Sequence, residues 1–261
     1  MRLFDCFMYN NENLILELRL NTLDKFVHKF VIVESAFDHQ GNKKKLRFNI
    51  NKFKKFKHKI KYLRLNKFPE NLSDWERENY HRNYIEKGII EADPDDLIMI
   101  SDVDEIPSIS NLNIFKKKKF TVFRQKMIYY RFNLQNTTEP YWYGSKVCKK
   151  KYLNSPQWLR NQKVKSYSFW RIDKINWNII KNGGWHFSFV MSDSMIAEKI
   201  KSFAHREFNN EKFNNLELIK KKIKQKKDIF GRKINFVKMK NNTDLPVYLL
   251  KNLKKFKHLM M

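Results

Sequence analysis

The sequence predicts an α/β fold: a mixed sheet of the Rossmann type, flanked by helices, in a single domain. Two observations lead to this prediction. Short apolar runs alternate with amphipathic stretches over residues 2–101, a pattern typical of βαβ units. Hydrophobic residues make up 42% of the 261 residues and aromatic residues 15%. The chain can therefore bury a large core, and disorder throughout is excluded.

The first strands and the first helix follow from local patterns. Residues 2–9 predict a strand, and residues 12–25 predict a helix because their apolar positions lie close to a helical period. Residues 30–34 are nearly all apolar, as in a strand covered on both faces. Residues 59–65 alternate and predict a third strand. The apolar positions of the helix are Leu14, Ile15, Leu18 and Leu23.

A second helix and a fourth strand complete this half. Ser73 and Glu76 have the spacing of a capping box, in which their side chains satisfy free amides of the first helical turn. We expect a helix from there to about Glu91, ended by Pro94, and then a buried strand over residues 96–101. Ligands of open parallel sheets bind beyond the carboxyl ends of the strands. Acidic residues at these ends are therefore candidates for chemistry.

The second half of the chain has weaker patterns. Residues 120–133 predict a long strand and residues 186–190 a short one. Two helices are expected, over residues 192–208 and over the Lys-rich residues 212–227.

No linker rich in Gly, Pro or Ser divides the chain. We expect one domain over residues 1–227 and a basic extension over residues 228–261, packed on that domain or trailing it. The chain has 54 Lys and Arg against 27 Asp and Glu, a net charge of +27. Such a charge points to nucleic acid, to an anionic membrane surface, or to a lysine-rich composition without a function of its own. The lysines are spread over many surface-like segments, which favours the last interpretation.

Cysteine usage and hydropathy predict a protein of the reducing cytoplasm. The first ten residues contain Asp5 and no continuous apolar stretch, unlike a signal peptide. No apolar run approaches the ~20 residues that cross a bilayer. The two cysteines, Cys6 and Cys148, fit neither a disulfide framework nor a zinc site.

The strongest candidate for chemistry is the acidic turn after the fourth strand. Residues 97–107 place three carboxylates, Asp102, Asp104 and Glu105, between an apolar strand and Pro107. Carboxylates this close repel one another unless a cation lies nearby. Hard oxygen ligands suit Mg²⁺ or Mn²⁺.

Three metal-dependent activities compete for this turn. A nucleotide-sugar transferase would hold a metal–diphosphate there, a phosphatase of the haloacid-dehalogenase type would use the first Asp as nucleophile, and a nuclease or polymerase would use two metals. The phosphatase is disfavoured because its acidic pair follows the first strand, and the nuclease because no second carboxylate cluster is evident. A basic nucleic-acid-binding protein and a phosphoryl-transfer enzyme remain alternatives.

Four segments of the chain together resemble glycosyltransferase family 17, whose best-known members transfer N-acetylglucosamine in β-1,4 linkage. The most specific are Asp-Val-Asp-Glu-Ile-Pro at 102–107 and Gly-Gly-Trp-His at 183–186. The resemblance implies a GT-A-like fold, a UDP-sugar donor, a saccharide acceptor and inversion at the anomeric carbon. It further implies that no nucleic acid is bound. The four segments lie within residues 11–48, 75–82, 96–107 and 183–205.

The resemblance also assigns roles to individual residues. Asp104 would ligate Mn²⁺ or Mg²⁺ together with His205, and Asp102 would hydrogen-bond the ribose or a metal-bound water, supported by Glu105. Inversion needs a general base, which the resemblance does not assign. Position alone favours Asp193, just past the Gly-Gly-Trp-His strand at an expected helix start, with Glu198 behind it. The other expected donor-binding residues are Asn11, Glu34, Arg82, Gly184, Trp185 and His186.

The sequence departs from the eukaryotic members of the family, because it lacks their membrane anchor and lumenal cysteines. We therefore expect a cytoplasmic enzyme, in peripheral contact with the inner, anionic membrane surface, that acts on a lipid-linked or polysaccharide acceptor.

Overall fold

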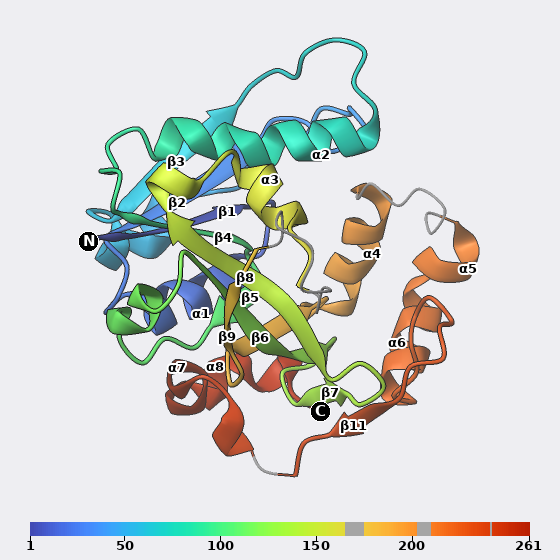
Figure 1. Cartoon of the computed structure of the whole chain (residues 1–261). Helices are drawn as coiled ribbons and strands as arrows, with labels where there is room; N and C mark the ends of the chain where they lie inside the picture. The colour runs from blue at the N-terminus through green and yellow to red at the C-terminus, as the bar shows by residue number, and fades with distance from the viewer. Residues whose placement is uncertain (165–174, 203–209, 241) are drawn as a thin grey trace, which may run out of the picture.

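Four parallel strands form the half of the sheet that the N-terminal part of the chain builds. The computed structural model describes residues 1–164, 175–202, 210–240 and 242–261. The strands β1 (Leu3–Met8), β2 (Lys29–Ser35), β3 (Ile60–Leu65) and β4 (Leu97–Asp102) lie in the order β4-β1-β2-β3 and are parallel throughout (Figure 1). These are the four strands that the apolar runs predict.

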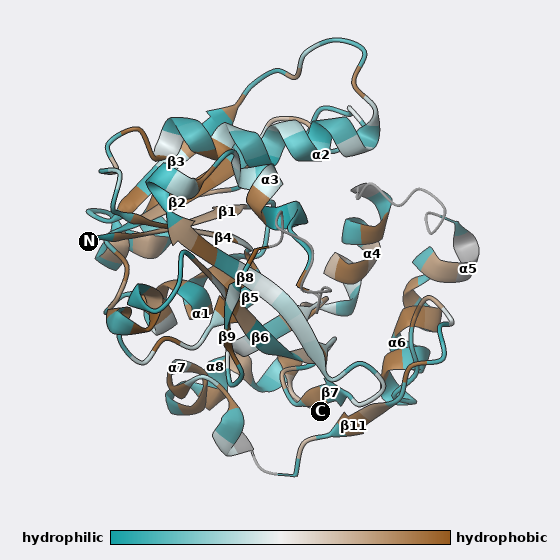
Figure 2. Ribbon diagram, in the orientation of Figure 1, coloured by the Kyte–Doolittle hydropathy of each residue, from teal (hydrophilic) through white to brown (hydrophobic). Residues whose placement is uncertain are grey.

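Each of these strands sends alternate side chains to opposite faces of the sheet. Phe7 of β1 packs in the cluster that includes α1 (Asn13–Leu23), and Cys6 packs in the cluster on the other face. Figure 2 shows these strands mostly brown and α2 mostly teal. A sheet covered on both faces explains why its strands are nearly continuous apolar runs.

Helix α2 (Asp74–Asn83) begins with the expected capping box: the Ser73 hydroxyl accepts from the Glu76 amide, and the Glu76 carboxylate accepts from the Ser73 amide. It ends earlier than the expected Glu91. A 3-10 helix at Tyr84–Gly88 follows, where a Cβ on Gly88 would lie 2.2 Å from Val31 Cγ1 of β2. The backbone at Gly88 therefore lies so close to β2 that a side chain there would clash with the sheet.

The second half of the sheet is mostly antiparallel. β8 (Tyr141–Lys149) pairs with β4 on one side and with β6 (Phe120–Tyr129) on the other, which joins the two halves. β10 (Gly184–Ser188) runs parallel to β6 and antiparallel to the short β5 (Glu105–Pro107). In the described residues the strands form one eleven-stranded sheet. Its remaining members are β7 (Leu134–Asn136), β9 (Trp177–Ile180) and β11 (Phe236–Lys238).

Several expected boundaries in this half are corrected. The strand expected to reach residue 133 ends at Tyr129, because Tyr130 has φ of 62°. The strand expected at 186–190 runs from Gly184 to Ser188, since Phe189 also has positive φ. Asn215 caps a new helix and thereby divides the one expected at 212–227. The two helices are α5 (Glu211–Asn214) and α6 (Leu216–Lys224).

The remaining helices pack around the sheet. α4 (Asp193–Ser202) lies within the helix expected at 192–208, whose last residues lie outside the described ranges. Residues 228–261 contribute β11 to the sheet, and their Leu249 and Phe256 are fully buried in the cluster that includes α1. Both cysteines are free and buried, and no helix in the described ranges is long and apolar enough to span a membrane. The other helical segments are Ile50–Phe56, Leu112–Lys116, Lys150–Tyr152, α3 (Pro156–Asn161), Asn242–Asp244, α7 (Val247–Lys251), α8 (Leu253–Phe256) and Lys257–Leu259.

Candidate active site at the carboxyl ends of the parallel strands

The acidic turn between β4 and β5 is fixed from beneath by a buried arginine. Arg19, fully buried in α1, forms a bidentate ion pair with Asp5 of β1, with donor–acceptor distances of 2.5 and 2.8 Å. Its remaining guanidinium nitrogen donates to the carbonyl oxygens of Asp102 at 3.1 Å and Glu105 at 2.7 Å. Because a guanidinium donates in a fixed planar fork, Arg19 sets the backbone path of the turn.

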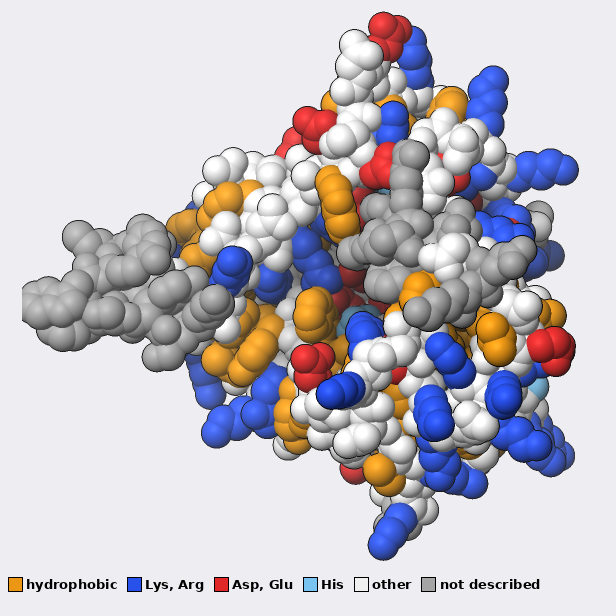
Figure 3. All heavy atoms as spheres, turned by 90° about the vertical axis from the view of Figure 1, so that its right-hand side faces the viewer, with side chains coloured by type: hydrophobic (Ala, Val, Ile, Leu, Met, Phe, Trp, Pro, Cys, Tyr) orange, Lys and Arg blue, Asp and Glu red, His pale blue; other side chains and the backbone are white. Residues whose placement is uncertain are grey.

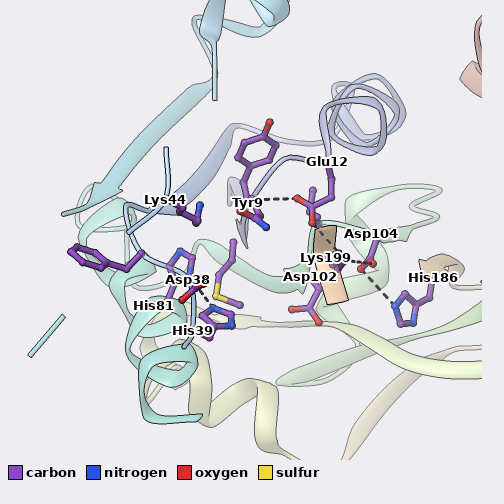
Figure 4. A pocket seen from close by; sticks show the side chains of 14 residues that line it. Tyr9, Glu12, Asp38, His39, Lys44, His81, Asp102, Asp104, His186 and Lys199 are labelled. Carbon is purple, nitrogen blue, oxygen red and sulfur yellow. Dashed lines mark hydrogen bonds and ion pairs between the residues drawn. The ribbon is translucent and has the colours of Figure 1, made fainter. Parts of the chain in front are cut away.

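A cavity of about 220 Å³ opens beyond the ends of β1, β2 and β4. Asp102, Asp104 and His186 lie at one end, and His39, His81 and Lys44 lie at the other (Figure 4). A smaller cavity of about 90 Å³ adjoins it and shares Glu12 and Lys199 with it. The other residues lining the main cavity are Met8, Tyr9, Asn10, Phe37, Asp38 and Val103.

Asp102 lies between two arginines. Its two carboxylate oxygens accept from Arg82 at 3.2 Å and from Arg160 at 2.7 Å. Burial alone would raise the pKa of Asp102, but the guanidinium groups of Arg160 and Arg82 outweigh burial and hold the pKa below its usual range. Asp102 is therefore a fixed negative charge at neutral pH.

Glu105 lies behind the cavity wall and organises the turn. It is fully buried, and its two oxygens accept from Arg160 at 2.6 and 2.9 Å. It also accepts from the Trp142 indole at 2.6 Å and from the Asp102 amide at 3.0 Å. Every oxygen of this carboxylate is engaged by the protein, so Glu105 supports the site without lining it.

Asp104 is the carboxylate of the turn that faces the cavity without an arginine partner among the described residues. His186 Nε2 lies 3.6 Å from its Oδ1, and Lys199 Nζ lies 3.9 Å from its Oδ2 (Figure 4). Burial raises the pKa of Asp104, although the His186 and Lys199 charges oppose this rise. A cation bound close to Asp104, in addition to Lys199, would therefore stabilise the ionised form of this carboxylate.

Lys199 links the acidic turn to the start of α1. Its ammonium lies 3.6 Å from Glu12 Oε1, and the other Glu12 oxygen accepts from the Asn10 and Asn11 amides at 3.0 Å. Burial would lower the pKa of Lys199, but Glu12 and Asp104 raise it above its ordinary value. The cavity thus contains a permanent positive charge beside Asp104.

The opposite end of the cavity carries a buried ammonium group and two histidines. Lys44 Nζ has no hydrogen-bond partner among the described residues and lies 3.8 Å from the carboxylate of Glu34. His39 Nε2 lies 3.4 Å from His81 Nδ1, and burial lowers the pKa of both histidines. Buried polar groups are normally paired, so this end is suited to a polar ligand.

The structure places Glu34 and Asn11 differently from each other. Glu34 is fully buried and accepts from the Arg47 and Phe48 amides at 2.7 and 3.1 Å and from the Tyr62 hydroxyl at 2.7 Å. It lies behind the wall of the cavity and holds the loop after β2. Asn11 lines the smaller, adjoining cavity.

Successive residues of β10 serve opposite faces of the sheet. Gly184 has φ of 105°, and a Cβ there would lie 2.3 Å from the Ile106 carbonyl oxygen, so only glycine fits. Trp185 faces a separate cavity of about 460 Å³ and donates to the Asp244 carbonyl at 2.6 Å. His186 alone of these three residues lines the cavity that contains Asp104.

Asp193 and Glu198, the residues expected to act as general base, do not line this cavity, although Glu198 lines the smaller one beside it. Asp193, at the start of α4, accepts from Arg131 at 2.7 Å and does not line the cavity, so its role as general base stays a prediction. Glu198 pairs with Arg47 at 2.6 Å. His205 lies outside the described residues.

The cavity offers two adjacent side chains with the chemistry of metal ligands. Asp104 and His186 offer a carboxylate oxygen and an imidazole nitrogen 3.6 Å apart. Across the described ranges, no group of three or more His, Cys, Asp or Glu side chains is arranged to hold a metal. Mg²⁺ sites commonly use one or two carboxylates and take further ligands from water and substrate phosphates. Asp104 and His186 are therefore the described side chains that could each give one ligand to a divalent cation, and an imidazole ligand favours Mn²⁺ over Mg²⁺.

Sequence reasoning missed several of these residues. Arg160 lies in α3, 58 positions from Asp102, and no local pattern connects the two. Lys199 is one lysine among many, and its role follows only from the position of α4. The opposite orientations of Trp185 and His186 could have been predicted from the sequence, because neighbouring side chains along a strand point to opposite faces of the sheet.

Comparison with known proteins matches this site and fold to one family. The model for glycosyltransferase family 17 matches residues 1–261. A beta-1,4-mannosyl-glycoprotein 4-beta-N-acetylglucosaminyltransferase of Rattus norvegicus is 23% identical over 292 residues, covering 99% of this chain and 54% of the relative. The protein of the same name from Homo sapiens is 29% identical over 117 residues, covering 41% of this chain and 22% of the relative.

This chain therefore spans about half the length of the rat relative. The match includes both the Asp102–Pro107 turn and the Gly183–His186 strand, which build the two sides of the cavity around Asp104. The match favours a transferase over the phosphatase and nuclease interpretations of that turn. The chain belongs to glycosyltransferase family 17.

Proposed function

We propose that this protein transfers N-acetylglucosamine from a UDP-sugar to a saccharide acceptor, with inversion, in a GT-A-like site at the carboxyl ends of β1, β2 and β4. The observation that carries the proposal is the polar cavity itself. Its one end holds Asp104, His186 and Lys199, and its other end holds His39, His81 and the Lys44 ammonium group, which has no hydrogen-bond partner among the described residues. The relatives named above support the sugar, since their names specify N-acetylglucosamine.

The cavity suits a nucleoside diphosphate sugar. Lys44, His39 and His81 offer polar atoms to the nucleoside at the end formed by the loop after β2 and by α2. Lys199, between Glu12 and Asp104, offers a positive charge to the diphosphate. Asp102, held by its two arginines, lines the cavity at the end of β4.

The reaction forms a bond between an acceptor oxygen and the anomeric carbon as the bond from that carbon to the diphosphate oxygen breaks. The acceptor hydroxyl gives its proton to a base, for which Asp193 is the prediction, and the diphosphate leaves with the bonding electrons. Lys199 stabilises the charge that develops on the leaving group, because a fixed cation in a buried site acts strongly there. A divalent cation held by Asp104 and His186 would supply further charge stabilisation when bound.

The test is hydrolysis of UDP-N-acetylglucosamine, together with calorimetric binding of UDP, each with and without Mn²⁺. Asp104→Asn is expected to lower the rate about 10²–10³-fold, the usual effect of removing one electrostatic group from a transition state. Asp95→Asn is the matched control, since Asp95 is 60% exposed and pairs only with surface lysines. If the wild-type protein binds no UDP both with and without Mn²⁺, the proposal is contradicted.

The net charge of +27 supports a related proposal about the acceptor. We expect a cytoplasmic enzyme whose basic surface contacts anionic lipid, which would bring it to a lipid-linked saccharide. Sedimentation with phosphatidylglycerol vesicles at low salt, reversed at high salt, is the expected result. Equal sedimentation with neutral phosphatidylcholine vesicles would contradict the charge-based contact.

A further inference from the structure

The cavity that contains Asp104 is called the donor cavity below. A second cavity that has Asp102 in its lining, of about 720 Å³, lies beside it. It is bounded by α2, the exposed end of β8 and α3. Asp102 lines both cavities, and its two arginine partners, Arg82 and Arg160, line the second one. We call this second cavity the aromatic groove.

Four large aromatic side chains line the groove while remaining partly open to solvent. Trp75 of α2 is 52% exposed, and Tyr141, Trp142 and Tyr143 of β8 are 45, 41 and 37% exposed. Figure 3 views the side of the molecule on which α4 lies and shows a hollow with orange side chains around it and red and pale blue atoms at its floor. The pale blue atoms are histidine, which lines the donor cavity and not the groove. Clustered exposed aromatic residues usually mark a binding surface.

Contacts beneath the rings hold two of them in place. The Trp142 indole donates to Glu105, and the Arg160 guanidinium lies 5.9 Å from its ring centroid. The Arg124 guanidinium lies 4.2 Å from the Tyr141 ring centroid. A ring fixed in this way presents one face to a ligand at little entropic cost.

The polar residues of the groove favour a neutral ligand over an anionic one. Arg82 and Arg160 are already paired with Asp102, and Arg160 also with Glu105. Lys146 donates to the carbonyls of Arg160 and Gln162 at 2.5 and 2.7 Å. Three of the four described cations that line the groove are therefore engaged within the protein, and the fourth is the exposed Lys163. A nucleic acid would need most of these charges for its phosphates. The groove is further lined by the amide side chains of Asn79, Gln157, Asn161 and Gln162.

We propose that the aromatic groove binds the acceptor saccharide and delivers its hydroxyl past Asp102 to the donor cavity. Saccharides combine apolar C–H faces, which pack on aromatic rings, with hydroxyls, which hydrogen-bond to amides and carboxylates. The groove offers both kinds of partner along one wall, and it meets the donor cavity at a single shared residue. This proposal rests on the proposed function, since it assigns the second substrate of the same reaction.

The test compares saccharide binding in the Tyr143→Ala and Trp75→Ala variants with that of Tyr80→Ala. Tyr80 lies on the same helix as Trp75 and, at 37%, is as exposed as Tyr143, but it packs edge-on against Phe68 and does not line the groove. The probes are mannosyl-chitobiose, chitotetraose and maltotetraose, and saturation-transfer NMR measures their binding. Each groove variant is expected to weaken binding of the preferred probe about tenfold, the loss typical of one stacking ring, and Tyr80→Ala is expected to leave it unchanged.

UDP binding, measured by calorimetry on the same variants, separates the two proposals. The expected result is unchanged UDP affinity in Tyr143→Ala and Trp75→Ala. If wild-type protein binds UDP but no saccharide probe, or if Tyr80→Ala weakens saccharide binding as much as the groove variants do, the groove proposal is overturned and the proposed function is not. Binding of a single-stranded oligonucleotide that is lost in the groove variants would also overturn it. Absence of UDP binding in the wild type would instead contradict the proposed function.

Discussion

The two halves of the sheet are stabilised in different ways. In the parallel half, β1, β2 and β4 form continuous ladders, and their side chains are buried on both faces. In the antiparallel half, long-range polar pairs hold short or irregular elements, as Arg160 holds Glu105 and Asp228 holds Tyr130. Local apolar patterns therefore specify the strands of the first half, although Arg2 and Arg19 there also contact residues distant in sequence. In the second half, the short β5 and the segment after β6 depend more on such distant side chains. Variants that remove single side chains should accordingly cost more stability in the second half.

The largest effect is expected for Arg160→Ala. This change leaves Asp102 and Glu105 without their shared guanidinium, and breaking a buried ion pair typically costs about 3–5 kcal/mol. Urea unfolding followed by circular dichroism measures the loss. Arg47→Ala is the control, since Arg47 and Glu198 are about half exposed and such pairs contribute roughly 0–1 kcal/mol. Equal losses in the two variants would contradict the comparison.

Gly184→Ala is expected to lower the free energy of unfolding by about 3 kcal/mol, since it combines overpacking with strain at positive φ. A Cβ at this position would meet the backbone of Ile106 and Ser108, which cannot move without disturbing the pairing of β5 with β10. Gly88→Ala in the parallel half would meet the Val31 side chain and should cost about 2 kcal/mol. Thermal unfolding of both variants tests the order, and a larger loss for Gly88→Ala would reverse the comparison.

Acid should destabilise the C-terminal segment through Asp228. Burial alone would raise the pKa of Asp228, but hydrogen bonds and charge from Arg232 outweigh burial and lower it. A carboxylate with a lowered folded-state pKa contributes stability above its unfolded pKa of about 3.9, and this contribution is lost as the pH falls through the folded value. Wild-type protein should therefore lose more stability than Asp228→Asn between pH 5 and pH 3, measured by thermal unfolding. If both proteins lose the same amount of thermal stability between pH 5 and pH 3, Asp228 is not the source of this acid sensitivity.

The smallest effect is expected for Trp185→Phe. It removes the hydrogen bond to the Asp244 carbonyl, which is worth about 1 kcal/mol, and keeps the ring that stacks on Phe187. Donor hydrolysis should be unchanged, because Trp185 faces away from the cavity that His186 lines. Trp142→Phe is the comparison, since its indole donates to the charged Glu105 and the loss should be about 2 kcal/mol. A change in donor hydrolysis in Trp185→Phe would show that the two faces of β10 are coupled.

The sequence predicted the parts of the fold that depend on local patterns. The apolar runs gave β1, β2 and β4, and the Ser73–Glu76 pair gave the start of α2, because neither depends on a distant partner. The predicted strand ends at residues 133 and 190 were wrong, because the strands end at Tyr129 and Ser188. The positive φ angles of Tyr130 and Phe189 that end them cannot be recognised from hydropathy. β8 was missed because its first residues are exposed and its later ones are buried on both faces.

The acidic turn was identified from the sequence, but the roles of its carboxylates were not. Their spacing along the chain does not distinguish Asp102, which accepts from two arginines, from Asp104, which faces Lys199 and His186. That difference arises from α2, α3 and α4, which bring their cations to the turn from distant parts of the chain. Charge partners selected by tertiary packing are invisible to a local pattern.

The shared position of Asp102 has a thermodynamic consequence. A ligand in either cavity changes the electrostatic environment of the same carboxylate and of the two guanidinium groups that hold it. Free-energy linkage requires that any resulting change in affinity be reciprocal, so that a saccharide that tightens UDP binding is itself bound more tightly in the presence of UDP, by the same factor. Donor affinities measured alone and with acceptor should therefore differ, and Asp102 is the residue through which that coupling would pass.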